Sequence, residues 1–130
     1  MQTGRFMKAS SFSSVLLAAI LVGCVSASKP HCPQTSDWPV AESSLVKPVT
    51  RLEARGEFLT RTTKDLSREL ARAQEEWFDS EWAKSFYAVK PGDRIWYYAE
   101  QKDPVLGGRR GYIAFRGCKV IGELTTEEDN

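Results

Sequence analysis

The sequence has little of what metalloenzymes, triad hydrolases and nucleic-acid-binding proteins need. It contains one histidine and three cysteines, which is too few for most metal cages and leaves no spare base for a catalytic triad. Its 18 basic and 17 acidic residues give a formal net charge of +1, so the strong positive charge of a nucleic-acid binder is missing. At 130 residues, the chain makes one domain at most. What remains informative is where the apolar residues lie.

The N-terminal residues have the order of a secretory signal. Arg5 and Lys8 form a short positive region, an apolar run over residues 15–22 follows, and small residues come next. A retained transmembrane helix is the alternative, because residues 9–28 carry no charge. Six of those residues are serines, however, and a bilayer core needs about 20 mostly apolar residues. The pattern therefore favours an export signal that is removed.

Within this signal, the segment Leu21-Val22-Gly23-Cys24 resembles the lipobox of bacterial lipoproteins. The resemblance implies cleavage that removes the signal peptide, residues 1–23, and lipidation of Cys24 on its sulfur and its new amine. Two or three acyl chains anchor a protein firmly in a membrane. In Gram-negative members of this class an aspartate after the lipidated cysteine favours the inner membrane. Val25 occupies that position here, which implies the outer membrane, periplasmic side.

A second cleavage site follows Val25-Ser26-Ala27 and would instead leave a soluble periplasmic protein. Either cut leaves Cys32 and Cys118 in an oxidising compartment, where a disulfide persists. We therefore predict a Cys32–Cys118 disulfide. The alternative is that Cys118 packs as an ordinary buried residue while Cys32 stays free.

Residues 24–45 are rich in serine and proline and predict a flexible lipidated tether. Trp38 stands out in this tether, and we expect it to dock on the domain near the disulfide. Contact with the membrane surface is its alternative.

The small folded domain is predicted to span residues 46–126. Within its first part, Pro48 and Gly56 interrupt the pattern, so we expect no helix beyond a turn or two around residues 51–54.

The strongest periodic pattern predicts one long helix that begins near Thr63, a residue type favoured as an N-cap, and ends near Phe86. Its apolar positions recur at spacings of three and four, as on one face of a helix. That face is predicted to bury Leu66, Leu70, Ala73, Trp77, Phe78 and Trp82. A turn at Pro91 and Gly92 should follow the helix.

After this turn the sequence predicts three antiparallel strands, over residues 93–100, 110–116 and 119–125. Gly117-Cys118 has the signature of a type II′ hairpin turn and would place Phe115 opposite Val120. Continued outward, this register puts Ile113 opposite Gly122 and Tyr112 opposite Glu123, which gives one apolar and one mixed face. Residues 127–130 should form a frayed acidic tail. The expected fold is α+β, with one long helix packed on a three-stranded antiparallel meander.

Two segments of the strand region, Gly92-Asp93-Arg94-Ile95-Trp96-Tyr97-Tyr98 and Gly108-Arg109-Arg110-Gly111-Tyr112, resemble small uncharacterised exported bacterial proteins. The resemblance covers about 30 residues and implies no activity.

Four groupings that could support catalysis or ligand binding fall short. A nucleophile pair of His31 and Cys32 is disfavoured, because the side chains of adjacent residues do not normally face each other. A metal site made of His31, Cys32 and Asp37 would have too few ligands. Glu75, Glu76 and Asp79 fit a solvated charged helix face better than a glycosidase pair. The glycine-rich residues 107–110 precede no helix and so make no phosphate loop. We therefore expect no enzymatic activity, no metal and no cofactor.

Aromatic residues are dense in the second half of the chain, and a small core leaves few places to bury them all. We therefore predict an aromatic and arginine surface on the sheet, with the alternative that its tyrosines only cap the sheet. This surface consists of Arg94, Trp96, Tyr97, Tyr98, Arg110, Tyr112 and Arg116.

Together these patterns favour a lipid-anchored, periplasm-facing binding or scaffolding module of the cell envelope. Acyl chains on Cys24 would hold it to the membrane, and an envelope protein would be its partner. An inhibitor or immunity-type lipoprotein that blocks an envelope enzyme is the alternative. A cell-wall binder that stacks aromatics on glycan is a third possibility, and nucleic acid is not an expected partner.

Overall fold

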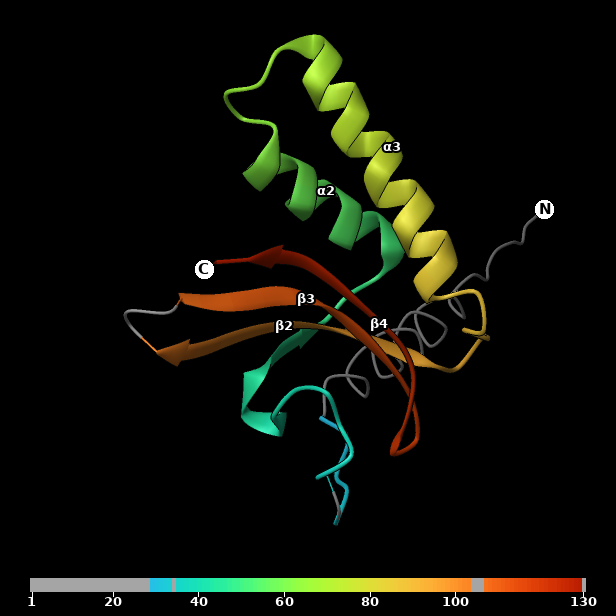
Figure 1. The fold of residues 1–130 in the computed structure, drawn as a ribbon. Helices are drawn as coiled ribbons and strands as arrows, with labels where there is room; N and C mark the ends of the chain where they lie inside the picture. The colour runs from blue at the N-terminus through green and yellow to red at the C-terminus, as the bar shows by residue number, and fades with distance from the viewer. Residues whose placement is uncertain (1–28, 34, 104–106, 130) are drawn as a thin grey trace, which may run out of the picture.

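A computed structural model describes residues 29–33, 35–103 and 107–129, and these form two helices and a four-stranded antiparallel sheet (Figure 1). The strands follow the order β1-β2-β3-β4 along the sheet. The elements are η1 Glu42–Ser44, β1 Leu45–Pro48, α2 Arg51–Thr62, α3 Arg68–Ser85, β2 Arg94–Asp103, β3 Gly107–Arg116 and β4 Lys119–Glu128. The fold is α+β as predicted, but the expectation of one helix and three strands was wrong, because α2 and β1 add to it.

Helix α2 forms because its first turn is closed by a capping box. The Thr50 hydroxyl accepts a hydrogen bond from the Glu53 N–H at 3.1 Å, and the Glu53 carboxylate accepts one from the Thr50 N–H at 3.0 Å. The helix then buries Ala54 and Phe58. Gly56 lies in its middle, where a glycine is unfavourable by about 1 kcal/mol relative to alanine. The prediction of only a turn or two here was wrong, because burial outweighs that penalty.

Helix α3 begins later than predicted. Its N-cap is Ser67, whose hydroxyl accepts a hydrogen bond from the Leu70 N–H at 3.3 Å, whereas Thr63 ends α2 through its own N–H to the Leu59 carbonyl. Its C-terminal end is close to the prediction, since Phe86 is the C-cap. The predicted turn follows, with Gly92 at a φ of +96°.

The sheet is covered on both faces, which differs from the predicted single apolar face. On the helix side, Phe78, Trp82 and Phe86 pack with Tyr112, Ala114 and Leu124. On the opposite side, Trp38, Val40 and Leu45 pack on Trp96, Tyr98, Ile113 and Phe115. Part of the segment predicted to be a tether therefore lies on the sheet and supplies core residues.

The register between β3 and β4 follows the prediction only next to the turn. Phe115 pairs with Val120 as expected, but a bulge then places Ile113 opposite Glu123. Ile121 is the extra residue of the bulge, because Phe115 pairs with Val120 and Ala114 pairs with Gly122. This shift of one residue turns the side chains that follow in β4 to the opposite face of the sheet from the predicted one. For this reason Tyr112 lies opposite Leu124. β4 also continues to Glu128, through residues that the sequence places in a frayed tail.

Cys32 and Cys118 form a disulfide, as predicted, with their Cα atoms 5.7 Å apart. Trp38 docks beside it, also as predicted: its indole N–H donates to the Cys118 carbonyl at 3.1 Å. Its ring lies 4.6 Å from that of Phe115. The disulfide thus holds the first described residues against the turn between β3 and β4. The predicted signal peptide and Cys24 lie outside the described residues.

Candidate functional site

The structure does not assemble the predicted aromatic and arginine surface. Trp96 and Tyr98 are buried beneath the N-terminal segment on one face of the sheet, and Tyr112 is buried beneath the helices on the other. Tyr97 is half-buried and lies on the helix side, where it packs against that cluster. Four aromatic residues therefore serve the core or its edge, and no continuous aromatic ledge for glycan stacking remains among them.

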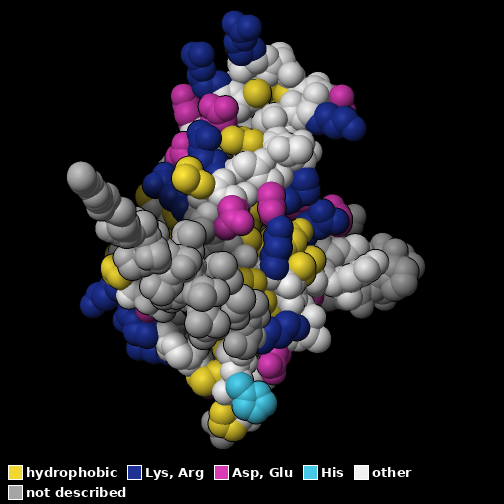
Figure 2. Space-filling view, turned by 180° about the vertical axis from the view of Figure 1, so that it is seen from behind, with side chains coloured by type: hydrophobic (Ala, Val, Ile, Leu, Met, Phe, Trp, Pro, Cys, Tyr) yellow, Lys and Arg dark blue, Asp and Glu magenta, His cyan; other side chains and the backbone are white. Residues whose placement is uncertain are grey.

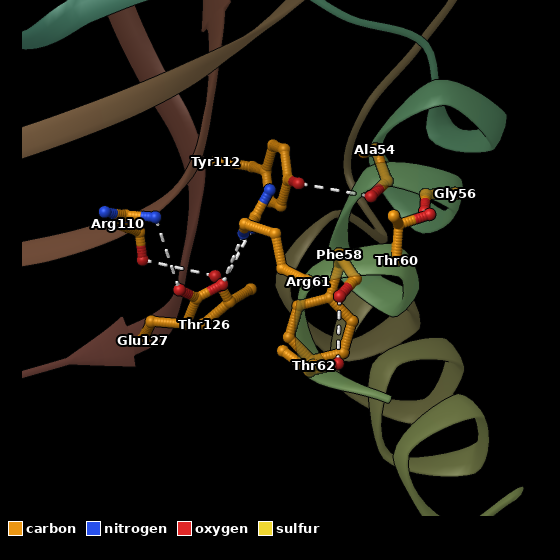
Figure 3. Close-up of polar contacts among 10 residues, drawn as sticks. All are labelled: Ala54, Gly56, Phe58, Thr60, Arg61, Thr62, Arg110, Tyr112, Thr126 and Glu127. Atoms are coloured by element: carbon orange, nitrogen blue, oxygen red, sulfur yellow. Dashed lines mark hydrogen bonds and ion pairs between the residues drawn. The ribbon is translucent and has the colours of Figure 1, made fainter. Parts of the chain in front are cut away.

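Tyr112 and Glu127 hold α2 on the sheet, and Arg110 shares the Glu127 carboxylate (Figure 3). The Tyr112 hydroxyl donates to the Ala54 carbonyl at 3.1 Å, and burial raises the pKa of that hydroxyl above its usual value. Arg61 of α2 donates to the Glu127 carboxylate at 2.9 and 2.8 Å, and Arg110 approaches the same carboxylate at 3.7 Å. These contacts are structural, and Glu127 is the acceptor they share.

Arg94 and Arg116, the two remaining members of the predicted surface, lie near the disulfide. Arg116 binds the Asp93 carboxylate at 2.9 and 2.8 Å. Arg94 is exposed and lines a hollow together with Lys29 and Gly117. They share an end of the molecule with each other but not with Arg110.

Three of the groups weighed for chemistry, Cys32, Glu75 and Asp79, make structural contacts. Cys32 is in the disulfide, so it is not a free thiol beside His31. Asp79 accepts two hydrogen bonds from Arg55, at 2.9 and 3.3 Å, and this partner lowers the pKa of its carboxyl. Glu75 lies 3.9 Å from the same guanidinium. Among the described residues, no group of three or more His, Cys, Asp or Glu side chains is placed to hold a metal.

The feature left over is an apolar stripe, which we call the α3 stripe: Leu70, Ala73 and Trp77 on the helix and Leu66 just before its N-cap. Leu66 is 38% exposed, Leu70 56% and Trp77 37%. The prediction that this stripe faces the core was therefore wrong. The two buried residues of α3, Phe78 and Trp82, both lie in its C-terminal half.

The α3 stripe is exposed because the N-terminal half of α3 rises away from the sheet (Figure 1). An 18-residue helix is about 27 Å long, so a helix that leaves the sheet at an angle extends well beyond it. At its base, the Trp77 ring stacks on Phe58 of α2 at 5.6 Å. Figure 2 shows hydrophobic side chains running down this projecting part between charged ones.

Two exposed acidic residues flank the α3 stripe, with Arg72 three residues from the first and four from the second. Glu69 and Glu76 are both exposed and are seven residues apart, so they lie on the same side of the helix, next to Leu70 and Trp77. The surface therefore combines large apolar side chains with an acidic rim. Such a combination is typical of a protein-binding surface whose partner carries the opposite charge.

The comparisons with known proteins add no relative. No protein-family model matches the chain, and no curated protein or solved structure is significantly similar to it. None of the helices in the described ranges is long and apolar enough to cross a bilayer.

Proposed function

We propose that this chain is a lipid-anchored, periplasm-facing module of the bacterial cell envelope that binds or scaffolds a protein partner through the α3 stripe. The observation that carries the proposal is the exposure of Leu70 and Trp77 on a helix that projects beyond the sheet, with exposed Leu66 just before the N-cap of that helix. Large apolar side chains at helical spacing are normally buried, and a cluster left exposed marks an interaction surface.

The partner is proposed to be a protein segment with an apolar face and flanking Lys or Arg residues. Leu70 and Trp77 would supply the apolar contact, because residues seven apart present a continuous face about two turns long. Glu69 on the rim favours a cationic partner and disfavours an acidic one. A second copy of this chain fits less well, because antiparallel pairing of two stripes would bring Glu69 of one copy near Glu76 of the other.

The proposed location rests on the lipobox segment and is supported by the disulfide. Disulfides persist in oxidising compartments such as the periplasm, so the Cys32–Cys118 bond agrees with export. Lipidation of Cys24 would then keep the module at the membrane while its projecting helix reaches into the periplasm. The Cys24→Ala variant should be found in the soluble periplasmic fraction. A variant that stays with the membrane contradicts the lipid anchor.

The binding surface is tested by placing a photo-crosslinking amino acid at the exposed position 73 of the lipidated protein in intact cells. We expect a crosslinked product with one envelope protein, and we expect the product to be lost when Leu70 is replaced by Glu. The matched control is Val46→Glu, because Val46 of β1 is 54% exposed, close to the 56% of Leu70, but lies away from α3. Loss of the product in both variants, or in neither, contradicts the assignment to the α3 stripe.

The identity of the crosslinked product separates the alternatives. A partner with an apolar segment flanked by basic residues supports the proposal, and its capture should weaken when Glu69 and Glu76 are changed to Lys. A product of two copies of this chain overturns it. A lytic or toxic envelope enzyme that loses activity on binding would make the chain an inhibitor or immunity-type lipoprotein instead.

A further inference from the structure

Basic side chains gather at the end of the molecule where three segments meet. These segments are the first described residues, the connection from α3 to β2 over residues 86–93, and the β3–β4 turn. We call this the basic end, and it consists of the exposed residues Lys29, Lys90, Arg94, Arg116 and Lys119. Figure 2 shows Lys and Arg side chains at its lower left, where the two turns of Figure 1 lie.

The contacts of these residues show that they form one surface. Lys29 and Arg94 line the same hollow as Gly117 of the β3–β4 turn. Lys119 pairs with Arg116 across that turn. The Arg116 guanidinium in turn donates to the Ala88 carbonyl of the α3–β2 connection at 3.1 Å.

Acidic groups offset part of this positive charge. The Asp93 carboxylate is bound by Arg116, so that ion pair adds no net charge, and the attraction to a membrane is carried by Lys29, Lys90 and Lys119. Asp37 is exposed and lines a hollow with Lys119 at the edge of the basic end. Tyr87 is 85% exposed on the α3–β2 connection, and tyrosine is a residue type enriched at the boundary between membrane and water.

The disulfide fixes this end of the domain close to the proposed lipid anchor. Cys32 is eight residues beyond Cys24, and eight extended residues span at most about 28 Å, roughly the diameter of a small domain. Because Cys32 is bonded to Cys118 in the β3–β4 turn, the tether leads to the basic end and to no other part of the fold.

We infer that the basic end is a membrane-facing surface that binds the anionic headgroups of phospholipids. The inference rests on the lipid anchor of the proposed function, which brings this surface to the bilayer. Lys and Arg residues near an anionic membrane each strengthen binding about fivefold. With the basic end on the bilayer, the α2–α3 loop lies at the opposite end of the molecule and the α3 stripe points into the periplasm (Figure 1).

The test measures how fast an amine-acetylating reagent modifies individual lysines in the lipidated protein. The protein is reconstituted in vesicles of phosphatidylcholine and in vesicles of phosphatidylcholine with an equal amount of phosphatidylglycerol. We expect acetylation of Lys90 and Lys119 to be about fivefold slower in the anionic vesicles. Lys64, exposed in the α2–α3 loop, is the internal control and should react at the same rate in both. About 1 M salt, where the Debye length is about 3 Å, should remove the difference.

Equal rates at Lys90 and Lys119 in the two kinds of vesicle overturn the inference. Failure of the lipid anchor gives a different result, because the protein then does not float with neutral vesicles at all. A second comparison uses the unlipidated Cys24→Ala protein and anionic vesicles. There the Lys90→Gln and Lys119→Gln double variant should bind at least tenfold more weakly than the Lys64→Gln control, and equal binding of the two also overturns the inference.

Discussion

Arg116 and Asp93 form a two-pronged ion pair that joins β3 to the turn after α3. The Arg116 Nε and Nη2 atoms donate to the two Asp93 carboxylate oxygens at 2.9 and 2.8 Å. The same carboxylate accepts the Lys90 backbone N–H at 2.7 Å. One acidic side chain therefore stabilises both the turn that begins β2 and the strand next to it.

This ion pair predicts acid sensitivity. The hydrogen bond from Arg116 lowers the Asp93 pKa from 3.8 to about 2. Because the folded-state pKa is the lower one, its contribution to stability is complete above pH about 4 and is lost as the pH falls toward about 2. Denaturant unfolding measured from pH 5 to pH 2 should show this loss, and Asp93→Asn should remove that part of the pH dependence. Asp37→Asn is the control and should keep it.

The disulfide is expected to contribute strongly to stability. Replacing both Cys32 and Cys118 by Ser should lower the free energy of unfolding by about 2–5 kcal/mol, because the reduced chain gains freedom when unfolded. Thermal unfolding of the variant, and of the wild type with and without reductant, measures the effect. Unchanged melting, or two alkylatable thiols in the exported protein, would contradict the bond.

Two glycines should respond in opposite ways to alanine. A Cβ at Gly122 would lie 2.3 Å from the Ser85 carbonyl and 2.8 Å from the Phe86 ring, so Gly122→Ala should destabilise the fold by about 1–3 kcal/mol. A Cβ at Gly56 meets nothing within 4 Å, and Gly56→Ala should stabilise α2 by about 0.5–1 kcal/mol. Chemical unfolding of both variants under the same conditions is the measurement. Equal shifts would mean that α3 does not approach β4 this closely.

The capping box of α2 is tested by Thr50→Ala. Loss of the hydroxyl that accepts from Glu53 should lower stability by about 1 kcal/mol. Thr60→Ala is a matched control on the exposed surface of the same helix, where alanine is the better helix former, and it should be neutral or slightly stabilising. If Thr50→Ala is as mild as Thr60→Ala in chemical unfolding, the box is not formed in solution.

Elements with strong local signals could be predicted from the sequence. The Gly117-Cys118 turn, the C-terminal end of α3 and the pairing of Phe115 with Val120 all depend on neighbouring residues. The disulfide also followed from counting cysteines. Helix α2 has its own local signal in Thr50 and Glu53, and Gly56, a poor helix former, obscures that signal in the sequence.

Elements that depend on distant contacts could not be predicted. The bulge at Ile121 leaves no pattern in the sequence, yet it reverses which side chains of β4 face the helices. The predicted binding surface failed because the N-terminal segment covers the second face of the sheet, which gives Trp96 and Tyr98 a core of their own. The spacing of the α3 stripe shows that it is apolar, but periodicity alone does not show whether a helix face has a partner.

The position of the disulfide also determines how mechanical force would pass through the molecule. The covalent path from Cys32 to the C-terminal end of β4 runs through Cys118 and β4 alone, so tension between those ends bypasses both helices. A pull on α3 takes another route. It divides between one arm through α2 and β1 and a second arm through β2 and β3, and the two arms meet again at the cystine. A force applied to the projecting helix is therefore shared by these two arms of the chain before it reaches the tether.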